Sequence, residues 1–131
     1  MSDKSIPPFP NKKEQHDECV EFLLSSAVVN IKKSDGKTSS SHEDLEKYVI
    51  EDRSMIMEQL SLIDPKIILC GYTFDHFKEI WSGEIKPVGN TEFIFQAQNH
   101  IVIDWWHPAN QYPNELCYYA LCAVVQEANV L

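Results

Sequence analysis

Short apolar runs alternate along the chain with stretches whose apolar residues recur at helical intervals. Uninterrupted apolar runs rich in β-branched residues are typical of strands buried on both faces of a sheet. Such runs predict strands at Val28–Ile31, Ile67–Cys70 and Ile101–Asp104, and Glu92–Phe95 is predicted as an edge strand.

Apolar residues spaced three and four apart predict amphipathic helices between these strands. The predicted helices span residues 14–24, 41–63, 74–81 and 113–126. The longest is expected to begin near Ser41, which an acid follows three positions later, and to end before a proline.

The order of elements, with helices separating most strands, predicts an α/β fold. We expect three or four strands in a mainly parallel sheet with helices on both faces. The proline-rich residues 1–13 are expected to form a flexible N-terminal arm, and residues 14–131 a single domain.

The net charge of the chain limits the kinds of molecule that it is expected to bind. A formal net charge of −9 disfavours generic nucleic-acid binding, which needs a basic face, and it fits a protein whose partner is basic. The sequence has no apolar run long enough to cross a membrane, and its first residues lack the apolar core of a signal peptide. We therefore expect a cytoplasmic protein that does not engage a membrane.

The cysteines give no sign of a metal or redox site. They stand at positions 19, 70, 117 and 122, and no two form a C-x-x-C pair. We expect free thiols in a reducing cytosol, no metal and no cofactor. The sequence also contains no glycine-rich phosphate-binding loop.

The segment after the strand at Ile101 holds the strongest candidate for chemistry. Pro108 cannot continue a sheet ladder, so the chain must turn there and leave His107 in a loop. In α/β folds, ligands bind beyond the carboxyl ends of the strands. His107 beside two tryptophans is therefore a site candidate, and a structural histidine held by backbone groups is the alternative.

Three segments in this order resemble the uracil-DNA glycosylase superfamily. They are Ala27–Lys33, ending in Asn-Ile-Lys-Lys; Leu62–Thr73, with Pro-Lys-Ile-Ile-Leu-Cys-Gly-Tyr-Thr; and Ile101–Pro108, ending in His-Pro. The resemblance covers roughly residues 27–125, and the order and spacing are more specific than any single segment.

The resemblance implies a role for several residues. Asn30 would read a flipped base along its Watson–Crick edge, because an amide carries both a donor and an acceptor. His107 would be the catalytic group that stabilises the departing pyrimidine anion. Residues 109–112, which include Asn110, would lie where the family inserts a loop into the duplex.

Other candidate substrate-binding residues each have a structural alternative. Lys33 could contact a phosphate or be a solvated loop residue. Trp105 or Trp106 could stack on a base, but side chains alternate along a strand, so one of the two is expected in the core. Without the resemblance, Asn30 would be interpreted as a turn-capping residue.

The chain departs from the family pattern in two ways. The family's opening motif, which supplies a core strand and positions the attacking water, has no counterpart before Ala27. Ser34 stands where the iron–sulfur branch has a cysteine, so no cluster is expected.

The missing strand would lie between the Asn30 strand and the Lys66 strand. Those two must then pair directly, or a protein partner or a second copy must fill the gap, because unpaired backbone groups inside a sheet are costly. The chain would thus be a shortened relative, a fragment of a longer enzyme, or one partner in a complex.

Three functional hypotheses follow. The chain is a glycosylase-like enzyme acting on a modified base, a non-catalytic relative that binds a protein or nucleotide, for example an inhibitor from a phage or other mobile element, or an assembly protein. The acidic charge and the absent motif favour the second. We therefore expect a glycosylase-like domain without hydrolytic activity of its own, with DNA or a nucleotide base as the partner implied by the resemblance.

Overall fold

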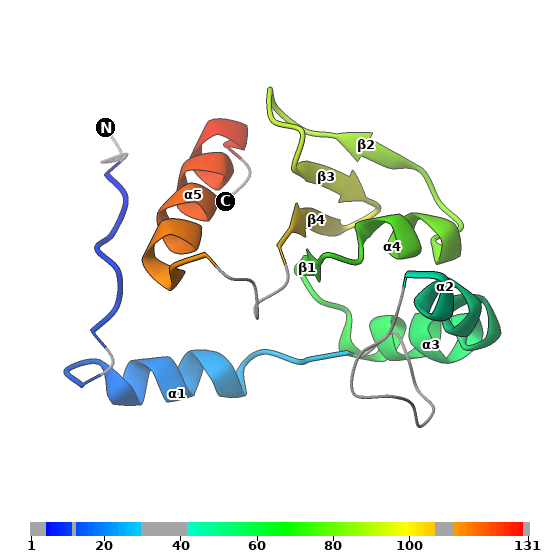
Figure 1. Cartoon of the computed structure of the whole chain (residues 1–131), viewed down its shortest axis with the longest axis horizontal. Coiled ribbons are helices and arrows are strands. Elements are labelled where there is room, and N and C mark those ends of the chain that lie inside the picture. Colours follow the sequence, from blue (N-terminus) through cyan, green and yellow to red (C-terminus); the bar gives the residue numbers. More distant parts are fainter. Residues whose placement is uncertain (1–4, 12, 30–41, 107–111, 130–131) are drawn as a thin grey trace.

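The computed structural model describes residues 5–11, 13–29, 42–106 and 112–129. A mixed four-stranded sheet forms its centre (Figure 1). The strands are β1 (Ile67–Gly71), β2 (Ile85–Pro87), β3 (Ile94–Ala97) and β4 (His100–Trp105). They lie side by side in the order β1-β4-β3-β2.

The sheet is mixed rather than mainly parallel, which corrects the sequence prediction. Only β1 and β4 pair in parallel, whereas β3 pairs antiparallel with both β4 and β2. Gln98 and Asn99 alone connect β3 to β4, and a connection this short permits only an antiparallel pair. Gln98 adopts a positive φ of 53°, as tight hairpin turns require.

Two strand assignments also change. The strand predicted at Glu92–Phe95 is Ile94–Ala97 and lies inside the sheet, between β4 and β2. Residues 85–87, which lie in none of the helices or strands predicted from the sequence, form the edge strand β2. A proline within so short a run conceals a strand from pattern analysis, although an edge strand tolerates it.

The strand predicted at Val28–Ile31 is absent from the described residues. Val28 and Val29 lie outside any strand, and the side chain of Val28 is 87% exposed. Asn30 and Ile31 lie outside the described residues. β-branched residues favour strands mainly through packing against neighbours, and Val28 has little such packing.

The helices are α1 (His16–Leu24), α2 (His42–Glu51), α3 (Arg53–Ile63), α4 (Phe74–Ile80) and α5 (Asn114–Ala128). The single helix predicted from Ser41 to Ile63 is therefore two helices that meet at Asp52, and Ser41 itself lies outside the described residues. Asp52 has φ −99° and ψ 12°, outside helical geometry. The apolar stripe continues across this break, so periodicity alone does not reveal it.

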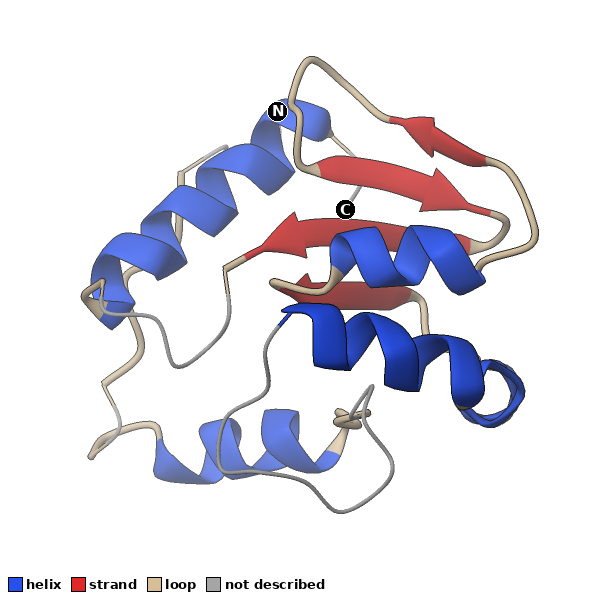
Figure 2. Ribbon diagram, turned by 45° about the vertical axis from the view of Figure 1, so that its right-hand side comes forward, coloured by secondary structure: helices blue, strands red, loops and turns tan. Residues whose placement is uncertain are grey.

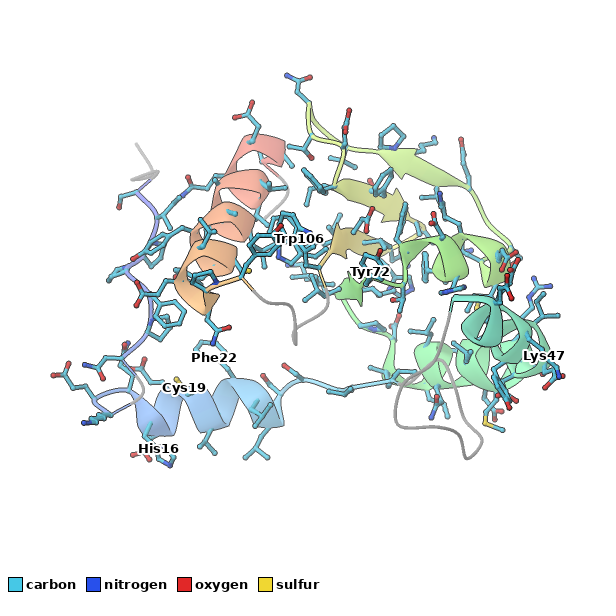
Figure 3. All side chains as sticks on the ribbon, viewed as in Figure 1. His16, Cys19, Phe22, Lys47, Tyr72 and Trp106 are labelled. Carbon is cyan, nitrogen blue, oxygen red and sulfur yellow. The ribbon has the colours of Figure 1, made fainter. Side chains whose placement is uncertain are left out.

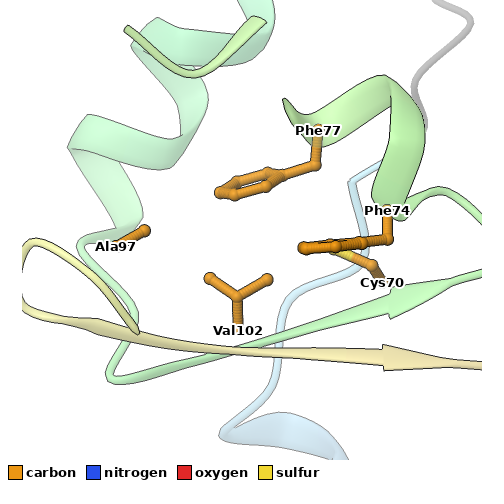
Figure 4. Packing of buried hydrophobic residues seen from close by; sticks show 5 residues of the cluster. All are labelled: Cys70, Phe74, Phe77, Ala97 and Val102. Atoms are coloured by element: carbon orange, nitrogen blue, oxygen red, sulfur yellow. The ribbon is translucent and has the colours of Figure 1, made fainter. Parts of the chain in front are cut away.

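The helices cover both faces of the sheet. Val102 and Ile103 are neighbours on β4, so their side chains point to opposite faces. On one face, Val102 packs with Cys70, Ala97, Phe74 and Phe77, the last two from α4 (Figure 4). Figure 2 shows α4 in front of the sheet on this face. On the other face, a second cluster packs against α5, and its buried members are Ile94, Ile103, Trp105 and Ala128.

Residues 5–11, predicted as part of a flexible arm, run alongside α5 (Figure 1). The backbone N–H of Phe9 donates to the hydroxyl of Tyr119 at 2.9 Å, and the Tyr118 hydroxyl donates to the carbonyl of Pro7 at 3.1 Å. The described helices include none that is long and apolar enough to span a membrane.

Candidate functional site at the carboxyl ends of β1 and β4

The parallel pair of strands brings two chain segments together at one edge of the sheet. In the register of β1 and β4, Cys70 lies opposite Asp104, and Gly71 opposite Trp105. The backbone N–H of Tyr72 then donates to the carbonyl of Trp105 at 2.7 Å, which extends the pairing beyond β1. The segments that follow β1 and β4 therefore begin side by side at this edge of the sheet.

Tyr72 has an unusual backbone conformation at this edge. Its φ is 62°, in the left-handed region that large side chains seldom adopt. Its side chain is among the most exposed aromatic groups, at 77%. Such local strain is concentrated at functional sites, so Tyr72 marks this edge as a candidate site.

Aromatic side chains gather where β4 ends. Trp105 is buried, whereas Trp106 is 40% exposed, and the two ring centroids are 4.8 Å apart. Trp106 also lies 5.8 Å from the ring of Tyr112, which is exposed just before α5. Figure 3 shows the side chains of Trp106 and Tyr72 near the ends of their strands. These exposed rings offer flat surfaces of the kind on which unpaired bases stack.

A polar cluster lies beside the same ends of β1 and β4. Asp104 is half-buried, and it interacts electrostatically with Cys70 of β1 and with Asp75 and Lys78 of α4. Asp75 and Lys78 form an ion pair at 3.1 Å. These α4 residues also line an open cavity of about 410 Å³ between α2 and α4.

Burial controls the ionisation of this cluster. Loss of solvation raises the pKa of Asp104 above its ordinary value; the negative charge of Asp75 adds to this shift and Lys78 opposes it. Burial, followed by the charge of Asp104, raises the pKa of the Cys70 thiol to about 12, against a hydrogen bond with the Thr73 side chain that lowers it. A thiol with this pKa is protonated at neutral pH and is not a nucleophile.

We expect Asp104→Asn to stabilise the protein at neutral pH by less than about 1 kcal/mol after solvent screening. The raised pKa means that the folded state holds the Asp104 proton more tightly than the unfolded state. Protonation of Asp104 therefore favours folding. This contribution to stability is lost as pH rises from the ordinary carboxyl pKa of the unfolded chain through the raised pKa of the folded state. The Asp104→Asn variant has no carboxyl group at this position, so it does not lose this stability as pH rises.

Urea unfolding at pH 4 and pH 7 measures the effect. The stability difference between Asp104→Asn and the wild type should increase toward pH 7. Asp17→Asn, an exposed carboxylate of α1, provides the matched control. A difference that is the same at both pH values would contradict the assigned ionisation of Asp104.

Of the five site residues predicted from the sequence, the structure describes one. Asn30, Lys33, His107 and Asn110 lie outside the described residues, so their proposed convergence stays a prediction. Trp105 is described, and its side chain lies in the core against Phe93 and α5.

Two residues of this edge, Asp104 and Tyr72, were not among the site residues predicted from the sequence. Asp104 could have been noticed, because it is the only acid in the apolar run 101–106. Nothing in the sequence marks Tyr72, because its positive φ results from how β1 joins α4.

Within the described ranges, no three His, Cys, Asp or Glu side chains are arranged to hold a metal ion. A scan against protein-family models and searches of curated proteins and of solved structures found no match to this chain.

Proposed function

We propose that the chain is a glycosylase-like binding domain that holds an unstacked base or nucleotide at the carboxyl ends of β1 and β4, without hydrolysing it alone. The adjacency of β1 and β4 carries this proposal. β1 lies within one of the three segments that resemble the uracil-DNA glycosylase superfamily, β4 overlaps another, and the two strands pair in parallel. The segment with His107 therefore begins beside Tyr72, at the edge where α/β proteins bind ligands.

The exposed aromatic rings support base binding. Stacking of one base on an aromatic side chain contributes about 1–3 kcal/mol and tolerates different sequences. Trp106 and Tyr112 supply such rings, and Trp106 directly precedes the predicted anion-stabilising residue His107 in the sequence. The net charge of −9 limits phosphate contacts, so we expect weak binding of single strands that decreases with salt.

The proposed lack of hydrolysis follows from the resemblance. The family needs a group that places water at the sugar carbon, and its opening motif has no counterpart in this sequence. Positioning of the nucleophile accounts for a large part of catalysis in general. A chain that keeps the base-holding residues alone would therefore bind without turnover.

A second candidate function is protein binding through the edge of β1, and the exposure of that strand favours it. Among the described residues, β4 is the only strand that pairs with β1. Ile67 and Leu69 lie on the same face as Ile103 but remain 41% and 48% exposed, because α5 does not fully cover β1. A strand from a partner or from a second copy would pair the free backbone groups and cover these side chains.

Fluorescence anisotropy with a labelled single-stranded oligonucleotide containing one uracil tests the base-binding proposal. Trp106→Ala should weaken binding roughly tenfold through loss of stacking. Leu69→Lys, on the edge of β1, is the matched control and should bind like the wild type. Equal affinity of wild type and Trp106→Ala, or no measurable binding at low salt, would refute base binding at this edge.

Sedimentation of the free protein tests the second candidate. A dimer that Leu69→Lys dissociates and Trp106→Ala preserves would identify the edge of β1 as the interface with a second copy. A monomer at all concentrations would exclude the second copy and leave a different protein as the occupant.

A further inference from the structure

Helix α1 carries an apolar face that the described chain leaves uncovered. This face consists of Val20, Phe22, Leu23 and Leu24, and the last three are 73%, 70% and 79% exposed. No residue of α1 is buried, and none belongs to the core clusters of the described residues. Figure 1 shows α1 at one side of the molecule, away from the sheet.

Contiguous exposed apolar side chains on one helix are unusual for a surface that faces only water. Exposed Leu and Phe in separate places need no explanation, but here they lie close together in the last turns of one helix, and Val20 stands three and four positions before Leu23 and Leu24, on the same side. The pattern is that of a helix whose apolar face docks into a groove of another molecule.

The opposite side of α1 is acidic and determines the kind of groove. Glu21 follows Asp17 by four positions and Glu18 by three, so the three carboxylates form one stripe on the side away from Leu23. The ion pairs found in the described part of the chain involve other residues, in α4 and near β2. A partner that covers the apolar face would gain from cations at its rim.

We propose that α1 docks into an apolar groove bordered by Lys or Arg on a partner protein. The apolar face supplies the buried contact, and the acidic stripe supplies charge complementarity that guides association and orientation. This surface is separate from the base-binding edge, so the inference does not depend on the proposed function.

The same charges argue against two other occupants. A second copy of α1 would bring two acidic stripes together, and each chain carries a net charge of −9. Membrane-surface helices are rich in Lys and Arg on their polar face, because cell membranes carry anionic lipids. The stripe of Asp17, Glu18 and Glu21 has the opposite sign.

The test uses the full chain and a synthetic helical peptide of about 14 residues, with leucine on one face and lysine on the other. The same peptide with glutamate in place of lysine is the control ligand. Fluorescence anisotropy of the labelled peptides should show binding of the leucine–lysine peptide alone. The affinity should fall as salt increases.

Two variants separate the contributions of the apolar and acidic sides. Phe22→Ser with Leu23→Ser should weaken binding at least roughly tenfold, because it removes two large exposed apolar side chains of this surface. Glu18→Lys with Glu21→Lys should weaken binding of the lysine peptide and strengthen binding of the glutamate peptide. Leu62→Ser, at an exposed position of α3, is the matched control and should leave both affinities unchanged.

Three outcomes of the binding measurements would overturn the proposal. They are equal binding of both peptides to the wild type, wild-type affinity in the Phe22→Ser/Leu23→Ser variant, and stronger binding to phosphatidylcholine vesicles than to the peptide. A dimer that the same double variant dissociates would also overturn it in favour of a second copy. Because α1 contributes nothing to the described core clusters, far-UV circular dichroism and urea unfolding should confirm that the variants remain folded.

Discussion

Trp105→Ala should destabilise the protein by about 3–5 kcal/mol. The Trp105 side chain is only 8% exposed and packs with Ile94, Ile103 and Ala128 between the sheet and α5. Its ring also meets that of Phe93 at 5.5 Å, edge to face. Truncation would leave a large cavity at the contact that holds α5 on the sheet, so urea unfolding should show a much lower midpoint.

Trp106→Ala is the matched control for this prediction. Trp106 directly follows Trp105 but is 40% exposed and belongs to no core cluster among the described residues. We expect a stability change below about 1 kcal/mol, as for most surface substitutions. Similar losses in both variants would show that the division into one core and one surface tryptophan is wrong.

Gly89→Ala should destabilise the protein by about 2–4 kcal/mol. Gly89 lies in the turn between β2 and β3 with a φ of +71°, which side chains disfavour. An added Cβ would lie 2.8 Å from the Cα of Ala128, a backbone atom near the end of α5. Either the turn or α5 must move, and thermal unfolding should report the loss.

Asn90→Ala is the control for the turn. Asn90 follows Gly89 and is exposed, so its truncation should change stability by less than about 0.5 kcal/mol. If Gly89→Ala changed stability as little as Asn90→Ala does, the turn could not approach α5 as closely as described.

The apolar runs predicted the two parallel strands well. β1 and β4 were expected at Ile67–Cys70 and Ile101–Asp104, and both are found within one residue of those bounds. The run of β4 is apolar at successive positions because helices cover both of its faces. Helices α4 and α5 were also predicted, since their apolar residues follow helical spacing.

The direction of β3 and the break in the long helix could not be predicted in this way. Periodicity reports which side chains are buried, and it gives no direction to a strand. A two-residue connection determines the direction of β3, and backbone angles at Asp52 end α2. The strand predicted at Val28 was wrong for a different reason. A β-branched residue stabilises a strand only when it packs against a neighbouring strand, and Val28 lies in none.

The position of the candidate site was predictable, but most of its composition was not. The pattern identified the carboxyl end of the strand at Ile101, and the structure adds the carboxyl end of β1 beside it. Tyr72 and the partners of Asp104 come from β1 and α4. They join the site only through the pairing of β1 with β4, which no single stretch of sequence contains.

A base-release assay tests the central claim most directly. Purified protein is incubated with uracil-containing single- and double-stranded oligonucleotides, and free uracil is measured together with binding of the same strands. We expect binding that Trp106→Ala weakens, and no release of uracil above that of buffer alone. Multiple turnovers that either Asn30→Ala or His107→Ala abolishes would contradict this claim, because another part of the chain would then position the attacking water.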